Sequence, residues 1–197
     1  MVERNPLIVA MTGASGSIYG VQLMRRALAL RVPVDLVLSA AAERVLRTET
    51  GLAGTTAELC GGAAPDLLQR HAVGDVGAAI ASGSYPTRGM VVIPCSMGTA
   101  ARIAHGISQS LIERAADVQL KEGRRLVAVV RESPLSLVHL KNLVLLKEAG
   151  AIVMPASPGF YHRPQTVADL VAFVVDRALM SLELLASPRS VWQGEEP

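Results

Sequence analysis

Aromatic side chains are scarce in this 197-residue chain, which has one Trp, three Tyr and two Phe. Basic residues are barely in excess, because 19 Lys and Arg stand against 17 Asp and Glu, for a formal charge of +2. Single-stranded nucleic acid is bound by aromatic stacking platforms, and nucleic acid in general by an extended basic face. The chain has material for neither, so we expect no nucleic-acid partner and only local cationic chemistry.

Cysteines and long apolar runs are also few. Cys60 and Cys95 are the only cysteines and lack metal-ligand spacing, which suits a reducing compartment better than a disulfide scaffold. The four histidines show no H-x-x-x-H pattern, so we expect structural or surface imidazoles and no metal site. The first apolar run, Leu7–Met11, is too short for a signal peptide, and no run approaches the ~20 residues of a membrane span. We therefore expect a cytoplasmic protein.

Half of the residues are apolar, enough for the core of one α/β domain of this length. Short branched apolar runs alternate with segments of helical period, which predicts a doubly wound parallel sheet. The expected strands are Leu7–Met11, Val34–Leu38, Met90–Ile93, Leu126–Val130 and Ala151–Met154. The expected helices are 18–30, 40–49, 107–121, 137–148 and 167–185. We assign 1–197 to this single domain and 186–197 to a C-terminal tail.

Polar motifs follow the expected strands. In a doubly wound sheet, ligands bind beyond the carboxyl ends of the strands, where loops enter helices. The spacing therefore predicts one polar crevice built from these loops. The motifs are TGASGS (12–17), Ser39, PCSMGT (94–99), RESPLS (131–136) and PASPGFYHRP (155–164).

The TGASGS loop has the composition of an oxyanion site. Gly13 and Gly16 let the backbone approach an anion, and Ser15 and Ser17 add hydroxyls at a helix start, where amides point outward. A tight turn with a serine N-cap explains the same letters. The loop matches neither the dinucleotide fingerprint nor the P-loop, so alone it leaves both interpretations open.

The PCSMGT loop repeats this design. We expect Pro94 to end its strand, Ser96 and Thr99 to offer hydroxyls, and Gly98 to open the backbone before a helical run that begins at Ala100. Cys95 has no histidine nearby in sequence, so we interpret it as a packed thiol rather than a nucleophile.

Charged and aromatic residues later in the chain divide into two groups. On the expected helix that contains Glu113, Arg114 and Lys121, we interpret most charges, Glu113 included, as a solvated face. Arg131 directly follows a strand, which places it at the crevice mouth. In PGFYHRP, a turn between two prolines carries Phe160 and Tyr161, typical of a lid or an anion contact; core filling would explain Phe160, whereas Tyr161 needs a polar partner.

Taken together, these segments resemble the UbiX-type flavin prenyltransferases over nearly the whole chain. The resemblance rests on TGASGS, SAAAERVLRTET (39–50), ASGS (81–84), the unbroken run 94–136, HLKNL (139–143) and the run 150–177. It implies a Rossmann-like, flavodoxin-like subunit that joins the dimethylallyl group of dimethylallyl phosphate to N5 and C6 of reduced FMN without a metal. It also implies prenylated FMN as the product, a UbiD-type decarboxylase as its recipient, and a homo-oligomer, typically a dodecamer with shared active sites.

The resemblance also assigns roles to single residues. The catalytic positions it implies are Ser15, Glu49, Lys121 and Glu132. The substrate-phosphate positions are Arg114, Lys121, Tyr161 and Arg177. The FMN contacts it implies are Gly13, Ala14, Ser15, Ser39, Ser96, Met97, Gly98, Thr99 and Arg131.

One departure and two alternatives remain. Val76 stands where some members carry an aromatic residue toward the prenyl group, whereas Trp192 matches a late aromatic of the family. The first alternative is an FMN-dependent cysteine decarboxylase, a class whose pattern has a catalytic histidine in the early helix region and an Asn-bearing loop after the fourth strand. Here Glu49 stands in the first place, and PCSMGT, which has no Asn, in the second. A non-catalytic FMN carrier would not need a second anion site, so Lys121, Glu132, Tyr161 and Arg177 discriminate against it.

Overall fold

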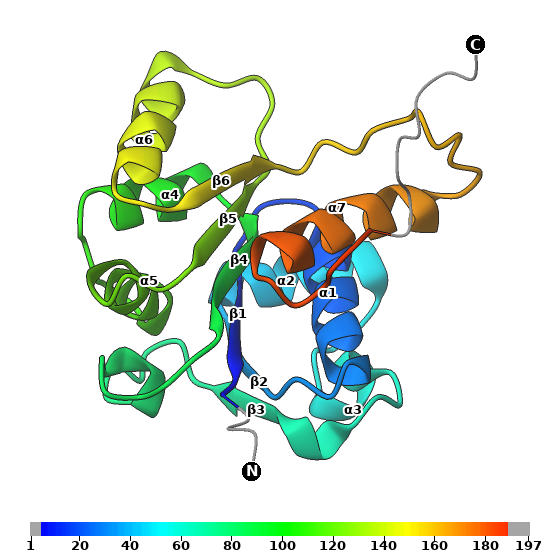
Figure 1. The fold of residues 1–197 in the computed structure, drawn as a ribbon, viewed down its shortest axis with the longest axis horizontal. Coiled ribbons are helices and arrows are strands. Elements are labelled where there is room, and N and C mark those ends of the chain that lie inside the picture. Colours follow the sequence, from blue (N-terminus) through cyan, green and yellow to red (C-terminus); the bar gives the residue numbers. More distant parts are fainter. Residues whose placement is uncertain (1–4, 189–197) are drawn as a thin grey trace.

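Six parallel strands form one sheet in a computed structural model that describes residues 5–188 (Figure 1). Their order is β3-β2-β1-β4-β5-β6, the order of Rossmann-type sheets. Successive strands are added on one side of β1 up to β3 and on its other side from β4 onward. The predicted doubly wound parallel sheet in a single domain is confirmed. The strands are β1 Leu7–Met11, β2 Val34–Leu38, β3 Leu68–His71, β4 Gly89–Cys95, β5 Leu126–Val130 and β6 Ile152–Pro155.

The central strands are the apolar runs that the sequence predicts. Every residue of β1, β2, β4 and β5 is buried, as expected for parallel strands covered on both faces. Pro94, expected to end its strand, lies inside β4. The pairing of β4 with β5 shifts register between Val92 and Cys95, and such an irregularity accommodates a residue without an N–H.

The edge strand β3 was not predicted. Its sequence, Leu-Gln-Arg-His, is polar, and Gln69 and Arg70 are exposed. A search for apolar runs cannot find such a strand, because its place at the sheet edge requires no continuous apolar surface.

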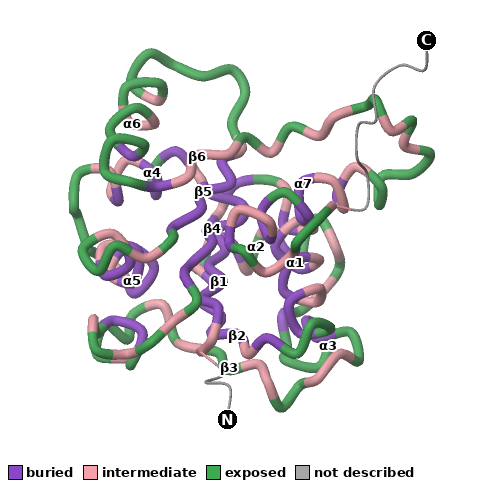
Figure 2. Tube along the Cα trace, viewed as in Figure 1, coloured by how far each residue is buried: buried purple, intermediate pink, exposed green. Residues whose placement is uncertain are grey.

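Helices cover both faces of the sheet. In β1, Leu7, Val9 and Met11 point into the core under α1, α2, α3 and α7, whereas Ile8 and Ala10 point toward α4, α5 and α6. Figure 2 shows the buried residues concentrated along the strands between these layers. The helices are α1 Ser17–Ala29, α2 Ala40–Thr50, α3 Thr56–Cys60, α4 Met97–Ala104, α5 Leu111–Lys121, α6 Leu137–Glu148 and α7 Val167–Ser181.

Capping residues explain where the helices differ from the prediction. The helix expected from residue 107 begins at Leu111, because the side chain of Ser110 accepts a hydrogen bond from the backbone N–H of Ile112 and forms a capping box with Glu113. Thr55 and Glu58 form the same box at the start of the unpredicted α3. The division of the chain at residue 186 stays a prediction; α7 ends at Ser181, and Trp192 lies outside the described residues.

Helix α6 is apolar on its outer side. We call this side the outer face of α6; its exposed members are Leu137, Val138, Leu140, Val144 and Leu145. Leu146 is the buried residue of the helix. A contiguous exposed apolar surface of this kind is typical of an interaction site. Among the helices that the structure describes, none has the length and apolar character needed to cross a membrane.

Candidate active site

A cavity of about 520 Å³ lies where the loops after β1 and β4 diverge to opposite faces of the sheet. This is the ligand-binding position of doubly wound folds, and the volume falls in the usual range for small-molecule sites. Its polar lining includes Thr12, Gly13, Ser39, Ser96, Thr99 and Arg102. The predicted polar crevice is therefore present in part: the loops after β1, β2 and β4 line it, whereas none of its lining residues comes from 131–136 or 155–164.

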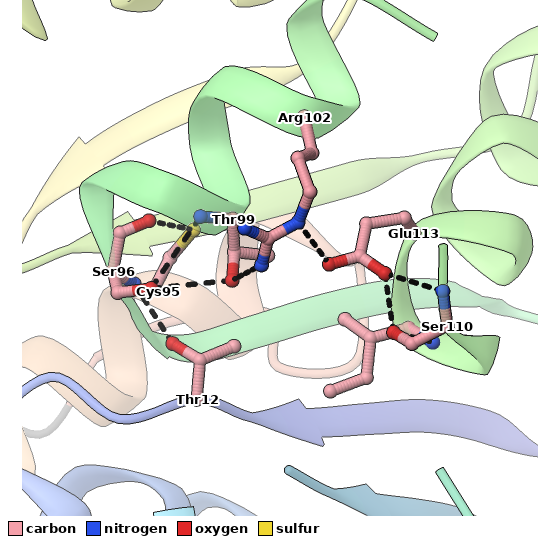
Figure 3. Close-up of polar contacts among 8 residues, drawn as sticks. Thr12, Cys95, Ser96, Thr99, Arg102, Ser110 and Glu113 are labelled. Carbon is pink, nitrogen blue, oxygen red and sulfur yellow. Dashed lines mark hydrogen bonds and ion pairs between the residues drawn. The ribbon is translucent and has the colours of Figure 1, made fainter. Parts of the chain in front are cut away.

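Thr12 fixes the geometry between the two central strands. Its buried Oγ1 donates a hydrogen bond to the carbonyl of Pro94 at 2.8 Å and accepts one from the backbone N–H of Ser96, also at 2.8 Å. Figure 3 shows the second of these bonds. One hydroxyl thus joins the end of β1 to the loop that opens α4.

Two serines begin helices at the cavity. The Ser39 hydroxyl accepts a hydrogen bond from Ala42 N–H at the start of α2, and the Ser96 hydroxyl accepts one from Thr99 N–H at the start of α4. Gly13 is needed for this approach, because a Cβ there would lie 2.5 Å from the Cβ of Ala41. The predicted residues Gly13, Ser39, Ser96 and Thr99 are therefore brought together.

The TGASGS loop holds a carboxylate instead of an open anion site. The backbone N–H groups of Gly16 and Ser17 donate to the carboxylate of Glu49, at 3.0 and 2.8 Å for Oε2. Gly16 has φ 107°, a conformation that favours glycine. Glu49, from the last turn of α2, thus occupies the positive start of α1, the place that one of the two interpretations of the loop gave to a ligand anion.

The same contacts determine the ionisation of Glu49. Partial burial opposes the charged form, but hydrogen bonds from the Ser15 hydroxyl and from the backbone N–H groups of Ser17 and Gly16 prevail and lower the pKa of the carboxyl. Glu49 is therefore an anion at neutral pH, within hydrogen-bonding reach of Ser15.

Arg131 joins the end of β5 to this loop. Its Nε donates to the carbonyl oxygen of Ser15 at 3.1 Å, and its place at the crevice mouth stays a prediction. The adjacent Glu132 is exposed, and its Oε1 accepts the backbone N–H of Ser133 at 3.1 Å. The structure thus places Ser15, Glu49 and Arg131 in one cluster with Glu132 at its rim.

A second cavity, of about 480 Å³, lies between β6 and α7 and is lined by Tyr161 and Arg177. The Tyr161 ring packs edge-on against Phe173, with 5.8 Å between centroids. Phe160, for which core filling was considered, is 68% exposed. The loop after β6 thus contributes to a second cavity and supplies no lining residue to the central one.

The comparisons with known proteins agree with this geometry. The Flavoprotein family model matches residues 1–179. A flavin prenyltransferase UbiX of Synechocystis sp. is 50% identical over 96% of each chain. The chain belongs to the UbiX flavin prenyltransferase family. The crystal structure of AnUbiX in complex with FMN and dimethylallyl pyrophosphate matches with a TM-score of 0.91 and 38% identity, over 98% of this chain and 100% of that one. A dodecameric FMN-dependent UbiX-like decarboxylase from Escherichia coli O157:H7 matches with a TM-score of 0.86 and 42% identity, over 96% and 100%.

Two cations that the family resemblance implies lie at opposite ends of α5, Arg114 in its first turn and Lys121 at its last residue. Arg114 pairs with Asp117 at 3.0 Å, and Lys121 pairs with Glu122 at 2.5 Å. Lys121 is the last residue of α5, shortly before β5 starts at Leu126, so it lies at the amino ends of the strands. The strands therefore separate it from Arg131 within one subunit.

Other predicted UbiX family contacts have limited side-chain access. Ala14 and Met97 are buried, at 5% and 6% exposure, so only their backbones are available to a ligand, whereas Gly98 is exposed. Cys95 is fully buried, and burial raises the pKa of its thiol to about 12, which confirms its interpretation as packing. Val76, at the position of a family aromatic, is 54% exposed.

Three of the four histidines are structural or surface imidazoles with a hydrogen-bond partner, as the sequence predicts. His71 Nε2 lies 2.7 Å from Asp35 Oδ1, His105 Nε2 lies 3.1 Å from Asn142 Oδ1, and His139 Nδ1 accepts the N–H of Ser136. His162 differs, because its ring stacks on Phe173 and its two buried nitrogens have no hydrogen-bond partner within residues 5–188. No group of three or more His, Cys, Asp or Glu in that range is arranged to hold a metal ion.

Sequence reasoning missed two functional candidates at the cavity, Arg102 and Glu113. Glu113 was predicted on a solvated face, but it is 3% exposed and pairs with Arg102. The S-x-x-E capping box of Ser110 and Glu113 was a readable signal that this carboxylate turns back toward the start of its helix. No comparable local signal marks Arg102, because its partner is on another helix.

Proposed function

We propose that this chain is a metal-independent flavin prenyltransferase that joins the dimethylallyl group of dimethylallyl phosphate to N5 and C6 of reduced FMN. One observation carries the proposal: the loop after β1 contributes Thr12 and Gly13 to the polar cavity between β1 and β4 and Ser15 to the cluster with Glu49 and Arg131. The 38% identity to AnUbiX, whose crystal structure contains FMN and dimethylallyl pyrophosphate, supports it.

The residues of the central cavity fit FMN. Gly13 brings the backbone close, Ser39, Ser96 and Thr99 offer hydroxyls, and Arg102 supplies a positive charge for a phosphate. Ala14, Ser15, Met97 and Gly98 complete the binding loops through backbone groups, and Arg131 closes them from β5. When bound, reduced FMN supplies the ring that accepts the dimethylallyl group.

The cations stabilise the leaving group. Breaking the C–O bond of an allylic phosphate builds negative charge on the departing oxygens, and fixed donors aimed at that charge lower the barrier. Tyr161 and Arg177 supply such donors from the second cavity, together with Arg131 at the crevice mouth. Exclusion of water by the aromatic loop would strengthen these contacts.

The two acidic residues handle protons. Glu132, at the rim beside Arg131, transfers a proton to the departing phosphate. Glu49 is held ionised against Ser15, so this pair can accept the proton lost from C6. The carboxylate that fills the start of α1 is thus the base, and the ligand phosphates bind elsewhere.

The active site is shared between subunits of a homo-oligomer, a dodecamer by analogy with the solved E. coli relative. Two features of this chain support sharing. Lys121 lies at the amino ends of the strands, so it reaches a substrate only on a neighbouring copy. The outer face of α6 leaves five large apolar side chains exposed in the single subunit, as expected of a subunit contact.

The product, prenylated FMN, goes to a UbiD-type decarboxylase. This recipient follows from the family, since a modified flavin has no further role in the reaction that makes it. Neither alternative function has a specific observation in its favour: Glu49 caps a helix where a cysteine decarboxylase would have a histidine, and a carrier would not need Arg177.

The product assay is the most direct test. Reduced FMN and dimethylallyl phosphate, incubated anaerobically with the protein, are expected to yield a flavin heavier by C5H8, together with free phosphate, detected by mass spectrometry. Boiled protein and oxidised FMN serve as controls. Recovery of unmodified FMN from protein that binds it would favour the carrier and exclude the transferase.

Glu132→Gln isolates the proton transfer. The amide can keep the local bond to Ser133 N–H but cannot donate an acidic proton, so turnover is expected to fall about 100-fold. Both ligands should still bind, because the side chain is exposed and outside the central cavity. Stopped-flow absorbance of the flavin measures the rate; an unchanged rate would remove Glu132 from the proton path.

A further inference from the structure

The base of the central cavity contains a buried carboxylate. Glu113 is 3% exposed and accepts hydrogen bonds from Arg102 Nε at 2.8 Å and from Ser110 N–H at 2.9 Å, together with one from the Ser110 hydroxyl (Figure 3). Burial would raise the pKa of Glu113, but the bonds from Ser110 and Arg102 and the charge of Arg102 lower it. The carboxylate is therefore ionised and anchored in the first turn of α5.

Arg102 is held from one side only. Its Nε bonds Glu113 and its Nη2 donates to Thr99 Oγ1 at 3.2 Å. Its Nη1 makes no hydrogen bond within residues 5–188, and the side chain remains 37% exposed at the cavity. A guanidinium has five donors in a rigid fork, so this one presents unused donors toward the ligand space.

The surroundings indicate which ligand these donors meet. Hydroxyls of Ser39, Ser96 and Thr99 line the same cavity at the starts of α2 and α4. The lining thus offers a fixed arginine, hydroxyls and two helix starts as donors, and the buried Glu113 carboxylate already accepts three hydrogen bonds. This donor set matches a phosphomonoester dianion rather than a neutral ribityl hydroxyl.

We propose that Arg102 binds the terminal phosphate of the flavin and that Glu113 is a positioning residue that aims Arg102 at it. The pair thereby selects phosphorylated flavin over riboflavin. This inference rests on the proposed function for the identity of the ligand. It adds two residues to the site and explains why an ion pair is buried beneath the cavity.

The test compares FMN with riboflavin, which lacks the phosphate. Arg102→Gln is expected to weaken FMN binding about 10-fold to 100-fold, the range for loss of a charge-assisted hydrogen bond, and to leave riboflavin affinity within about 2-fold. Quenching of flavin fluorescence measures both constants. Arg31→Gln is the matched control, because it removes one exposed positive charge after the C-terminus of α1, and FMN affinity should not change.

Glu113→Gln tests positioning. The amide keeps the size of the side chain but loses the charge that orients Arg102, so FMN affinity is expected to fall about 3-fold to 10-fold with riboflavin unchanged. A merely structural role would lower both affinities together. Phosphorus NMR of bound FMN gives a second readout: in wild type the phosphate should stay dianionic to lower pH than in Arg102→Gln.

The outcomes separate the two proposals. If the wild type binds no FMN, the flavin function and this inference both fall. If the wild type binds FMN and Arg102→Gln binds it equally well, or loses riboflavin in parallel, only the phosphate assignment falls. An unchanged FMN affinity in Glu113→Gln would overturn the positioning role of Glu113.

Discussion

Thr12→Val is expected to destabilise the protein by about 2 kcal/mol. The substitution preserves shape but removes the hydroxyl that serves both the carbonyl of Pro94 and the N–H of Ser96. The Ser96 N–H would then lose its partner, at a cost of about 1–3 kcal/mol, whereas the Pro94 carbonyl would keep the backbone N–H of Thr12 at 3.2 Å. Urea unfolding followed by circular dichroism measures the loss as a lower midpoint at constant slope.

Thr12→Ser is the matched control for this bridge. It keeps the hydroxyl and removes one methyl group, so a cost near 1 kcal/mol is expected. The flavin should also bind more weakly to the valine variant than to the serine variant, because the loop that carries Ser96 loses its attachment to β1. Equal unfolding free energies for the two variants would show that the bridge does not stabilise the fold.

Arg177→Ala is expected to lower kcat/KM for dimethylallyl phosphate about 100-fold to 1000-fold and to leave FMN bound. Arg177 lines the second cavity with Tyr161, apart from the cavity assigned to FMN, so its charge acts on the leaving phosphate alone. Removal of one donor to a developing anion has effects of this size. Steady-state phosphate release measures the rate, and flavin fluorescence measures FMN affinity.

Two further variants sharpen this experiment. Arg177→Lys keeps the charge but not the fork, so activity should be intermediate. Arg31→Ala removes a remote arginine and should leave both quantities unchanged. Loss of FMN from Arg177→Ala, at unchanged unfolding free energy, would place Arg177 in the flavin site and contradict its assignment.

The sheet was predictable from the sequence because its strands are covered on both faces. Burial on both sides forces continuous apolar runs such as Leu7–Met11 and Val34–Leu38, and their bounds match β1 and β2. The edge strand β3 was missed for the converse reason, since Gln69 and Arg70 are free to be polar there. Pattern reasoning thus finds the centre of such a sheet better than its edges.

Site residues were predictable where they directly follow a strand. Ser39, Ser96 and Arg131 all follow strands, and parallel strands bring their carboxyl ends together. Contacts between distant segments were not predictable in this way. The hydrogen bonds from the TGASGS loop to Glu49 span more than 30 residues, and only the folded chain shows that the loop already holds an anion.

The burial of Glu113 illustrates a different limit. Helical periodicity places a charged residue outside by default, and it contains no information about a cation on a neighbouring helix. The pairing of Arg102 with Glu113 crosses from α4 to α5. Helical periodicity therefore placed Glu113 in solvent, whereas the structure buries it at the base of the cavity.

The two borders of the sheet make strand-to-strand growth unfavourable. One border, β3, exposes Gln69 and Arg70, and Arg70 is tied to Glu43 of α2; the other, β6, is four residues long and ends in Pro155. Polar or charged side chains, shortness and proline are the usual protections against an added strand. We therefore expect copies of this chain to meet through helices rather than through sheet edges, so that substitutions on α6 would change the quaternary structure and leave the hydrogen-bonded sheet intact.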